Sequence, residues 1–106
     1  MAAERYRRRE GIAWREEAEA AREALEALAQ GRDASAEGTL LLVERGRVFE
    51  LNLLGAEIWK LLDGERDVAA VVDELLPRFE VGRAELEADV REFLADLAAR
   101  GWVVPA

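Results

Sequence analysis

The sequence predicts an α+β fold in which an antiparallel β-hairpin or a three-stranded sheet precedes a bundle of three helices. Two apolar segments flank a glycine turn within residues 39–51, which is typical of a hairpin. From residue 52 onward, apolar residues recur at helical spacing in three successive segments. The chain has 106 residues, the length expected of one domain with a single core. A hairpin followed by three helices is a winged-helix-like arrangement.

The N-terminal part, residues 1–38, is expected to hold a charged arm, a short strand and an extra helix. Ile12 and Trp14 alternate with small or charged residues, which predicts the strand. Residues 16–30 consist mainly of alanine, glutamate, arginine and leucine, which favour a helix over about this range. The arm contains a basic cluster, formed by Arg5, Arg7, Arg8 and Arg9.

Residues 39–44 and 47–51 form the predicted hairpin, with Arg45 and Gly46 as its turn. This turn would set two cross-strand apolar pairs on one face, which are Leu42 with Phe49 and Leu40 with Leu51. The opposite face is unusually apolar for a solvated surface. We therefore expect the surroundings of the first strand, the 16–30 helix or another chain to cover it. That face carries Leu41, Val43, Val48 and Glu50.

Each of the three later helices has a residue suited to one of its ends. The side chains of Asn52 and Asp67 can accept unpaired backbone N–H groups where the first and second helices begin. The first helix is expected to run to about Asp63, and Pro77 is expected to bend or end the second because proline lacks an N–H. The third helix, from about residue 83, has the most regular apolar stripe. This stripe contains Leu86, Val90, Phe93, Leu94 and Leu97, and an apolar tail at residues 102–104 follows it.

The composition argues against an enzyme and against a metal or cofactor site. The chain contains no cysteine and no histidine, so it lacks the thiolate ligand, the imidazole ligand and the most common general base. Its single serine, Ser35, has no histidine to activate it. The carboxylates fall at predicted helix caps and on polar helix faces, and no phosphate-binding loop is present. We therefore expect no catalytic residues, no metal and no cofactor.

Charge and hydropathy argue against nucleic acid and membrane partners. The net charge is −8, from 23 acidic and 15 basic residues, whereas a nucleic-acid-binding domain normally carries a basic face. The third predicted helix has three arginines against five acids, so a groove of DNA would repel it. No stretch approaches the roughly 20 apolar residues that a membrane-spanning helix needs. We therefore expect a cytoplasmic protein.

The strand at residues 47–51 would be a sheet edge if the first strand pairs with residues 39–44. An edge presents unpaired N–H and C=O groups, to which an extended peptide can add as another strand. The third helix would then supply an apolar wall beside this edge. The alternative is that the edge is covered and that these apolar residues only form the core.

The ordered set of residues from the hairpin to the C-terminus resembles the PqqD-like peptide chaperones, also called RiPP recognition elements. The resemblance covers roughly residues 39–104. The matching residues are Leu51-Asn52, Gly55 to Trp59, Leu61 to Gly64, Val71-Val72, Leu75, Phe79, Asp89 to Leu97 and Gly101-Trp102. Residues 39–106 are accordingly expected to form the recognition domain. The 16–30 helix departs from the family pattern, because many relatives turn tightly there, and Pro77 interrupts a helix that is usually continuous.

The resemblance implies that the chain binds the leader segment of a ribosomally synthesised precursor peptide and presents it to a modifying enzyme. That enzyme is often of the radical-SAM type, or a leader peptidase in lasso-peptide pathways. In the family the leader lies antiparallel along the strand equivalent to 47–51 and against the third helix. Carried over, the peptide-binding residues are Arg47, Val48, Phe49, Glu50, Leu51, Asp89, Val90, Arg91, Phe93, Leu94 and Leu97.

A second hypothesis remains open. The chain would then be a winged-helix-like protein–protein interaction or dimerisation domain that does not bind leaders. The 16–30 helix and the apolar edge make exchange of a strand or arm between two copies, and so a homodimer, possible.

Overall fold

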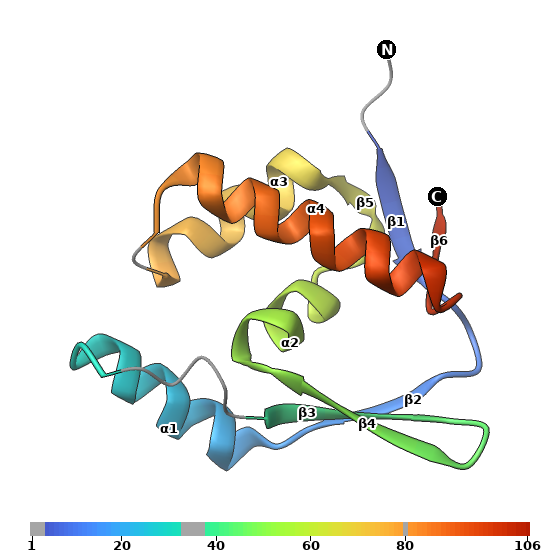
Figure 1. The fold of residues 1–106 in the computed structure, drawn as a ribbon, viewed down its shortest axis with the longest axis horizontal. Helices are drawn as coiled ribbons and strands as arrows, with labels where there is room; N and C mark the ends of the chain where they lie inside the picture. Colours follow the sequence, from blue (N-terminus) through green and yellow to red (C-terminus); the bar gives the residue numbers. More distant parts are fainter. Residues whose placement is uncertain (1–3, 33–37, 80) are drawn as a thin grey trace. The chain divides into compact units, whose positions relative to one another are not determined.

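The computed structural model describes residues 4–32, 38–79 and 81–106. Figure 1 shows its helices and strands, which confirm the α+β class. The lone serine, Ser35, lies outside the described residues. The chain divides into two compact units. One contains Gly11–Glu57, and the other contains Met1–Glu10 and Ile58–Ala106.

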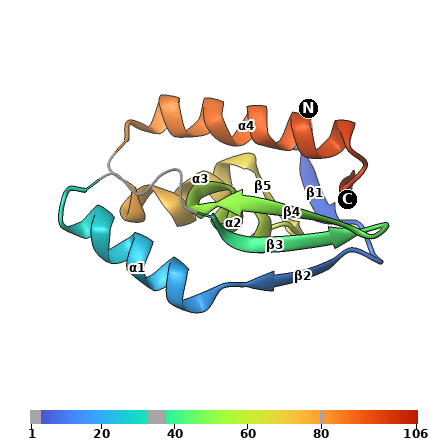
Figure 2. The same cartoon turned by 60° about the horizontal axis from the view of Figure 1, so that its bottom comes forward.

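The Gly11–Glu57 unit contains a three-stranded antiparallel sheet in the order β2-β3-β4. β2 is Ala13–Glu16, β3 is Gly38–Glu44 and β4 is Arg47–Asn52. The three strands lie side by side in Figure 2, with β3 in the middle. The predicted first strand therefore pairs with the hairpin.

The turn between β3 and β4 sets the register of the hairpin. Arg45 and Gly46 both have positive φ angles, 51° and 77°, as a type I′ turn requires. The register places Leu42 opposite Phe49 and Leu40 opposite Leu51, which confirms both predicted cross-strand pairs.

The two faces of this sheet differ in burial. Leu40, Leu42 and Leu51 are buried, whereas Val43 and Val48 on the opposite face are 42% and 64% exposed. The prediction that this second face is covered is therefore wrong at these two valines. The reason lies in the preceding helix, α1, which spans Ala18–Ala29. It packs against β3, but its buried residues are only two alanines, a stripe too narrow to cover the face.

The helix α2, Leu53–Lys60, is fixed at both ends by side chains. Asn52 Oδ1 accepts a hydrogen bond from the Gly55 N–H at 2.9 Å, which confirms the predicted cap. At the other end, Arg8 Nη1 donates to the carbonyl oxygens of Trp59 and Lys60, at 2.9 and 3.0 Å. The helix ends before the predicted Asp63, because the chain turns at residues 61–62 and enters a strand.

The second unit contains another three-stranded antiparallel sheet, in the order β5-β1-β6, which the sequence did not predict. β1 is Arg5–Arg8, β5 is Asp63–Asp67 and β6 is Val103–Pro105. The predicted charged arm is therefore wrong at β1, and the predicted apolar tail is wrong at β6. Both segments are strands because their backbones find partners far away in sequence. The basic side chains of Arg5 and Arg7 lie opposite Asp67 and Asp63.

The remaining helices of this unit follow the predicted pattern. α3 is Val68–Leu75, a short 3-10 turn at Leu76–Arg78 follows, and α4 is Arg83–Ala99. Asp67 Oδ1 accepts a hydrogen bond from the Ala70 N–H at 2.8 Å, so the predicted cap of α3 is confirmed. The predicted end of α3 near Pro77 is confirmed as well. α4 packs against α3 and β6.

Candidate functional site

β4 lies at one edge of the β2-β3-β4 sheet. Among the residues that the structure describes, β3 is its one neighbouring strand. Such an edge can accept a further strand through its main chain.

The register shows which backbone groups point to that edge. In a two-residue hairpin the pair next to the turn, Glu44 and Arg47, exchanges hydrogen bonds, and bonded and non-bonded pairs then alternate. Phe49 is thus in a bonded pair and directs its N–H and C=O toward β3. Val48 and Glu50 are in non-bonded pairs. Their N–H and C=O groups therefore point away from β3, to the open side of the sheet.

The side chains of β4 alternate between the two faces. Arg47, Phe49 and Leu51 share one face, and they pass from exposed to half-buried to 8% exposed along the strand. Val48 and Glu50 lie on the other face and are exposed. The predicted strand residues therefore form a continuous edge in which only Leu51 is buried.

Gly38 leaves space for the Glu50 side chain, a feature that sequence reasoning missed. A Cβ atom built on Gly38 would collide with Glu50 Cγ, Cδ and Oε1. The Glu50 carboxylate therefore lies over β3 and away from the open side of β4. The sequence signal was a glycine at the start of a strand, which often marks a close approach of this kind.

The six predicted residues on α4 fall into two groups. Three of them are buried side chains on the apolar stripe. These are Val90, Leu94 and Leu97, with exposed fractions of 0%, 4% and 0%. Asp89 and Phe93 are half-buried, while Arg91 is exposed and forms an ion pair with Glu87, 3.1 Å between Nη2 and Oε1. The second group is the part of α4 that a ligand could reach without repacking the core.

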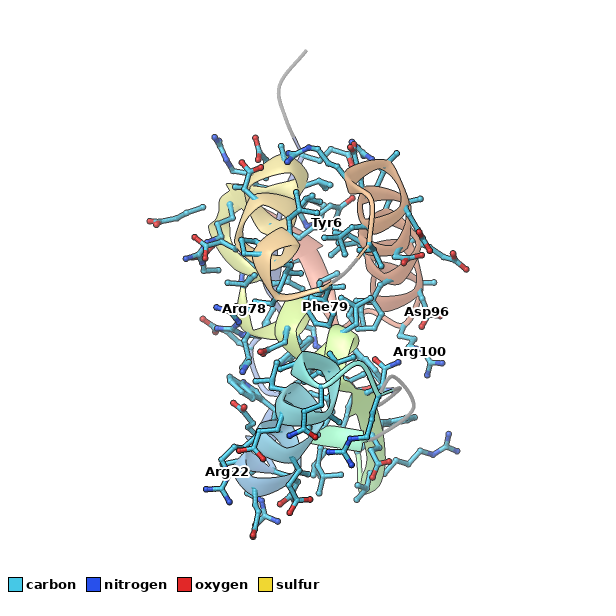
Figure 3. The ribbon with its side chains drawn as sticks, turned by 90° about the vertical axis from the view of Figure 1, so that its left-hand side faces the viewer. Tyr6, Arg22, Arg78, Phe79, Asp96 and Arg100 are labelled. Carbon is cyan, nitrogen blue, oxygen red and sulfur yellow. The ribbon has the colours of Figure 1, made fainter. Side chains whose placement is uncertain are left out.

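α4 also carries an ion pair at its C-terminal end. Arg100 Nε lies 3.2 Å from Asp96 Oδ2, and Figure 3 shows these two side chains close together. The Arg100 guanidinium carbon also lies 5.0 Å from the centre of the Trp102 ring, within range of a cation–π contact. These contacts stabilise the end of the helix and the following turn, so we assign them no part in ligand binding.

The candidate residues on β4 and those on α4 belong to different compact units. The structure brings each set together within its own unit. A groove formed by both sets stays a prediction.

The described residues offer little chemistry beyond main-chain and apolar contacts. They contain no cluster of side chains that could hold a metal ion. No helix in the described ranges is long and apolar enough to cross a membrane. The pKa of the Asp63 carboxyl is held below its ordinary value chiefly by a hydrogen bond from the Glu65 N–H, with Arg66 contributing. This group lies on β5, away in sequence from the candidate residues, and has a structural role.

Residues 37–103 match the family described as Coenzyme PQQ synthesis protein D (PqqD). A curated "PqqA binding protein" of Rhodopseudomonas palustris (strain TIE-1) is 43% identical over 60 residues, 57% of this chain and 59% of that protein. The chain therefore matches less than two thirds of this relative's length. A protein of the same name from Pseudomonas fluorescens (strain Pf-5) is 39% identical over 71 residues, 67% of this chain and 76% of its own length.

Two solved structures share the fold. One is described as TbiB1 in complex with the TbiA(beta) leader peptide; it has a TM-score of 0.64 and 20% identity, over 92% of this chain and 93% of that one. The other is a lasso peptide synthetase B1 complexed with the leader peptide; its TM-score is 0.64 and its identity 22%, over 94% and 98% of the two chains. At this level of identity, the likeness establishes the fold alone.

Proposed function

The chain belongs to the PqqD family, and we propose that it is a non-catalytic peptide chaperone that binds the leader segment of a ribosomally synthesised precursor peptide. The leader adds as a strand to the outer edge of β4, and the chaperone presents it to a modifying enzyme. The observation that carries this proposal is the edge itself, where Val48 and Glu50 direct backbone groups to the open side. The names of the PqqA-binding relatives and of the two leader-peptide complexes support it.

The partners follow from this role. The precursor leader is the ligand, and the modifying enzyme is of the radical-SAM type. The place of action is the cytoplasm, where ribosomes make the precursor. In this proposal, residues 39–106 form the winged-helix-like recognition domain, and α1 is an addition that precedes it.

The proposal assigns ligand contacts to each unit separately, to the edge of β4 in one unit and to accessible side chains of α4 in the other. Asp89 and Phe93, four residues apart on one side of α4 and intermediate in burial, face the ligand. Arg91 lies on another side of the helix, where it pairs with Glu87. Val90, Leu94 and Leu97 hold the helix in place from within the core. The main chain of β4 supplies affinity through hydrogen bonds, and neighbouring side chains supply selectivity.

Titration calorimetry tests the proposal with a synthetic peptide of the leader encoded near the gene. We expect binding with a dissociation constant of tens of micromolar or tighter, about −6 kcal/mol or better. The matched control is a peptide with the same residues in scrambled order. A leader that binds no better than its scrambled form would contradict the proposal.

A pair of proline variants tests the edge within that experiment. Val48→Pro removes an N–H that points to the open side, so we expect it to weaken leader binding about 3- to 10-fold, the worth of one hydrogen bond. Val48→Ala retains the N–H and is the control for the lost side chain. Phe49→Pro removes an N–H directed at β3, so we expect it to destabilise the hairpin itself. Equal effects of Val48→Pro and Val48→Ala on leader binding would argue against strand addition at β4.

The second candidate is a dimerisation or interaction domain without leader binding, because the same edge could pair with β4 of another copy. Light scattering separates the two functions. A monomer that binds the leader supports the chaperone function. A dimer whose mass and stability do not change when the leader is added supports the alternative.

A further inference from the structure

Three small apolar residues form a row across the β2-β3-β4 sheet. Ala13 lies opposite Val43, and Val43 lies opposite Val48, so the three side chains share one face. All three are exposed, and the two valines are 42% and 64% exposed. Val48, on the edge strand β4, is more exposed than Val43 on the central strand β3. We name Ala13, Val43 and Val48 the exposed row.

The row ends where the edge can accept a ligand strand. Val48 directs its N–H and C=O to the open side, so an added strand would place one residue directly opposite it. The side chain of that residue would lie on the same face as Val48, with Cβ atoms about 5 Å apart. The added residue would therefore become the fourth member of the exposed row.

The neighbouring side chain on this face leaves Val48 uncovered. Glu50 lies two residues further along β4, but its carboxylate occupies the space over Gly38. An incoming side chain opposite Val48 therefore meets an apolar surface without having to displace a charge. On the other side of Val48 the strand reaches Gly46, which has no side chain.

We propose that Val48 is a specificity-determining residue, and that the bound leader strand carries a β-branched or aromatic side chain directly opposite it. This inference rests on the proposed function and adds a selectivity on the exposed face of the sheet. Apolar cross-strand pairs of this kind favour binding by up to about fivefold over a poorly matched side chain. The preference does not depend on whether the leader runs parallel or antiparallel, because opposite residues share a face in both cases.

The test uses the full chain and a yeast-displayed library of random peptides long enough to form one strand. The library is sorted for binding to the wild-type protein, to Val48→Lys and to Val43→Lys. Val43→Lys is the matched control, since it places the same charge on the same row, one strand further from the ligand. Both valines are exposed, so neither substitution removes core packing.

We expect the wild-type protein to enrich β-branched or aromatic residues at one position of the selected peptides. With Val48→Lys that same position changes to Asp or Glu, whereas with Val43→Lys it stays apolar. Calorimetry on a selected peptide and its variant with Glu at that position gives the size of the preference. We expect about fivefold for the apolar form with the wild-type protein, and the reverse with Val48→Lys.

Failure of this inference and failure of the proposed function give different results. If peptides and the natural leader bind but Val48→Lys selects the same apolar residues at that position as the wild-type protein does, the inference is wrong and the chaperone function stands. If Val43→Lys changes the selection as Val48→Lys does, the contact is not at the edge and the inference also falls. If neither the library nor the leader binds, both proposals are overturned.

Discussion

The edge strands of the two sheets differ in the residues that they carry. In the β5-β1-β6 sheet, every residue of the edge strand β5 except Gly64 is charged, an ion pair of 2.7 Å joins Arg66 and Asp63, and β6 ends at Pro105. Charges and proline are common means of preventing a further strand from pairing. In the β2-β3-β4 sheet, the two outward positions of β4 carry Val48, which is 64% exposed, and Glu50, whose carboxylate lies over Gly38. Of the two sheets in the described residues, the second thus has the edge better suited to accepting a ligand, and the contrast supports the proposed site.

The largest expected difference between the two sheets is in the stability lost when proline replaces a residue of a central strand or of an edge strand. β1 is a central strand, so Arg7→Pro removes an N–H that bonds to one of its two neighbours. We expect a loss of about 3 kcal/mol in the free energy of unfolding, since a backbone partner is left unpaired and the central strand is distorted. Val48→Pro removes an outward N–H, and we expect it to lower stability by about 1 kcal/mol or less. Urea unfolding measures both, and similar losses would show that β4 is no edge.

The next effect concerns the arginine that joins β1 to α2. Arg8→Met keeps the length of the side chain but removes two hydrogen bonds to the last carbonyl groups of the helix. We expect a loss of about 1.5–3 kcal/mol, the range for hydrogen bonds from a charged group. Arg5→Met, at an exposed position of the same strand, is the control and is expected to change stability by less than about 0.5 kcal/mol. If the two variants lose equal stability, Arg8 has no specific role at the helix end.

A smaller effect, of opposite sign, is expected in the other sheet. Thr39 is fully buried, and its hydroxyl has no hydrogen-bond partner among the described residues. Thr39→Val replaces the hydroxyl with a methyl group of similar shape, so we expect a gain of about 1 kcal/mol in thermal or urea unfolding. Thr39→Ser retains the hydroxyl and is expected to lose stability. A loss with valine as well would indicate that the hydroxyl has a bound water as its partner.

The smallest effect concerns pH and the charged edge β5. The pKa of Asp63 is lowered in the folded protein from its ordinary value of 3.8. A lowered pKa means that the carboxylate stabilises the fold at pH values above 3.8, and that this stabilisation is lost as the pH falls below 3.8 and through the lower folded-state pKa. Asp63→Asn is therefore expected to unfold with a shallower pH dependence below pH 4, while at neutral pH it is slightly less stable. An unchanged acid dependence in this variant would contradict the assignment.

Local signals in the sequence predicted the hairpin and the helix ends correctly. Gly46 with a positive φ, the caps Asn52 and Asp67, and the helix end near Pro77 all depend on neighbouring residues. β1 could not be predicted in this way, because its strand character comes from partners in β5 and β6, which are 56 to 62 and 95 to 99 residues away. Four arginines within five residues predict a solvated arm, and only the distant partner strands show that this segment is a strand.

The candidate site was predictable to a similar extent. The β4 edge followed from the hairpin once β2 was known to pair with β3. The helical stripe left two roles open for Val90, Leu94 and Leu97, which were core packing and contact with a ligand, and the structure buries all three in the core. Gly38 at the start of a strand was a signal for a close approach, but its partner Glu50 could not be predicted because the contact joins two strands.

The central place of β1 has a consequence for the order in which the chain can fold. All three strands of the β2-β3-β4 sheet lie within residues 13–52, so this sheet can form while the chain is still being synthesised. β1 leaves the ribosome first, yet one of its neighbours, β6, comes almost a full chain length later. Contacts so distant in sequence form slowly. Pulse-labelled hydrogen exchange should therefore protect the amides of β3 and β4 before those of β1, and simultaneous protection would show that the two sheets fold as one.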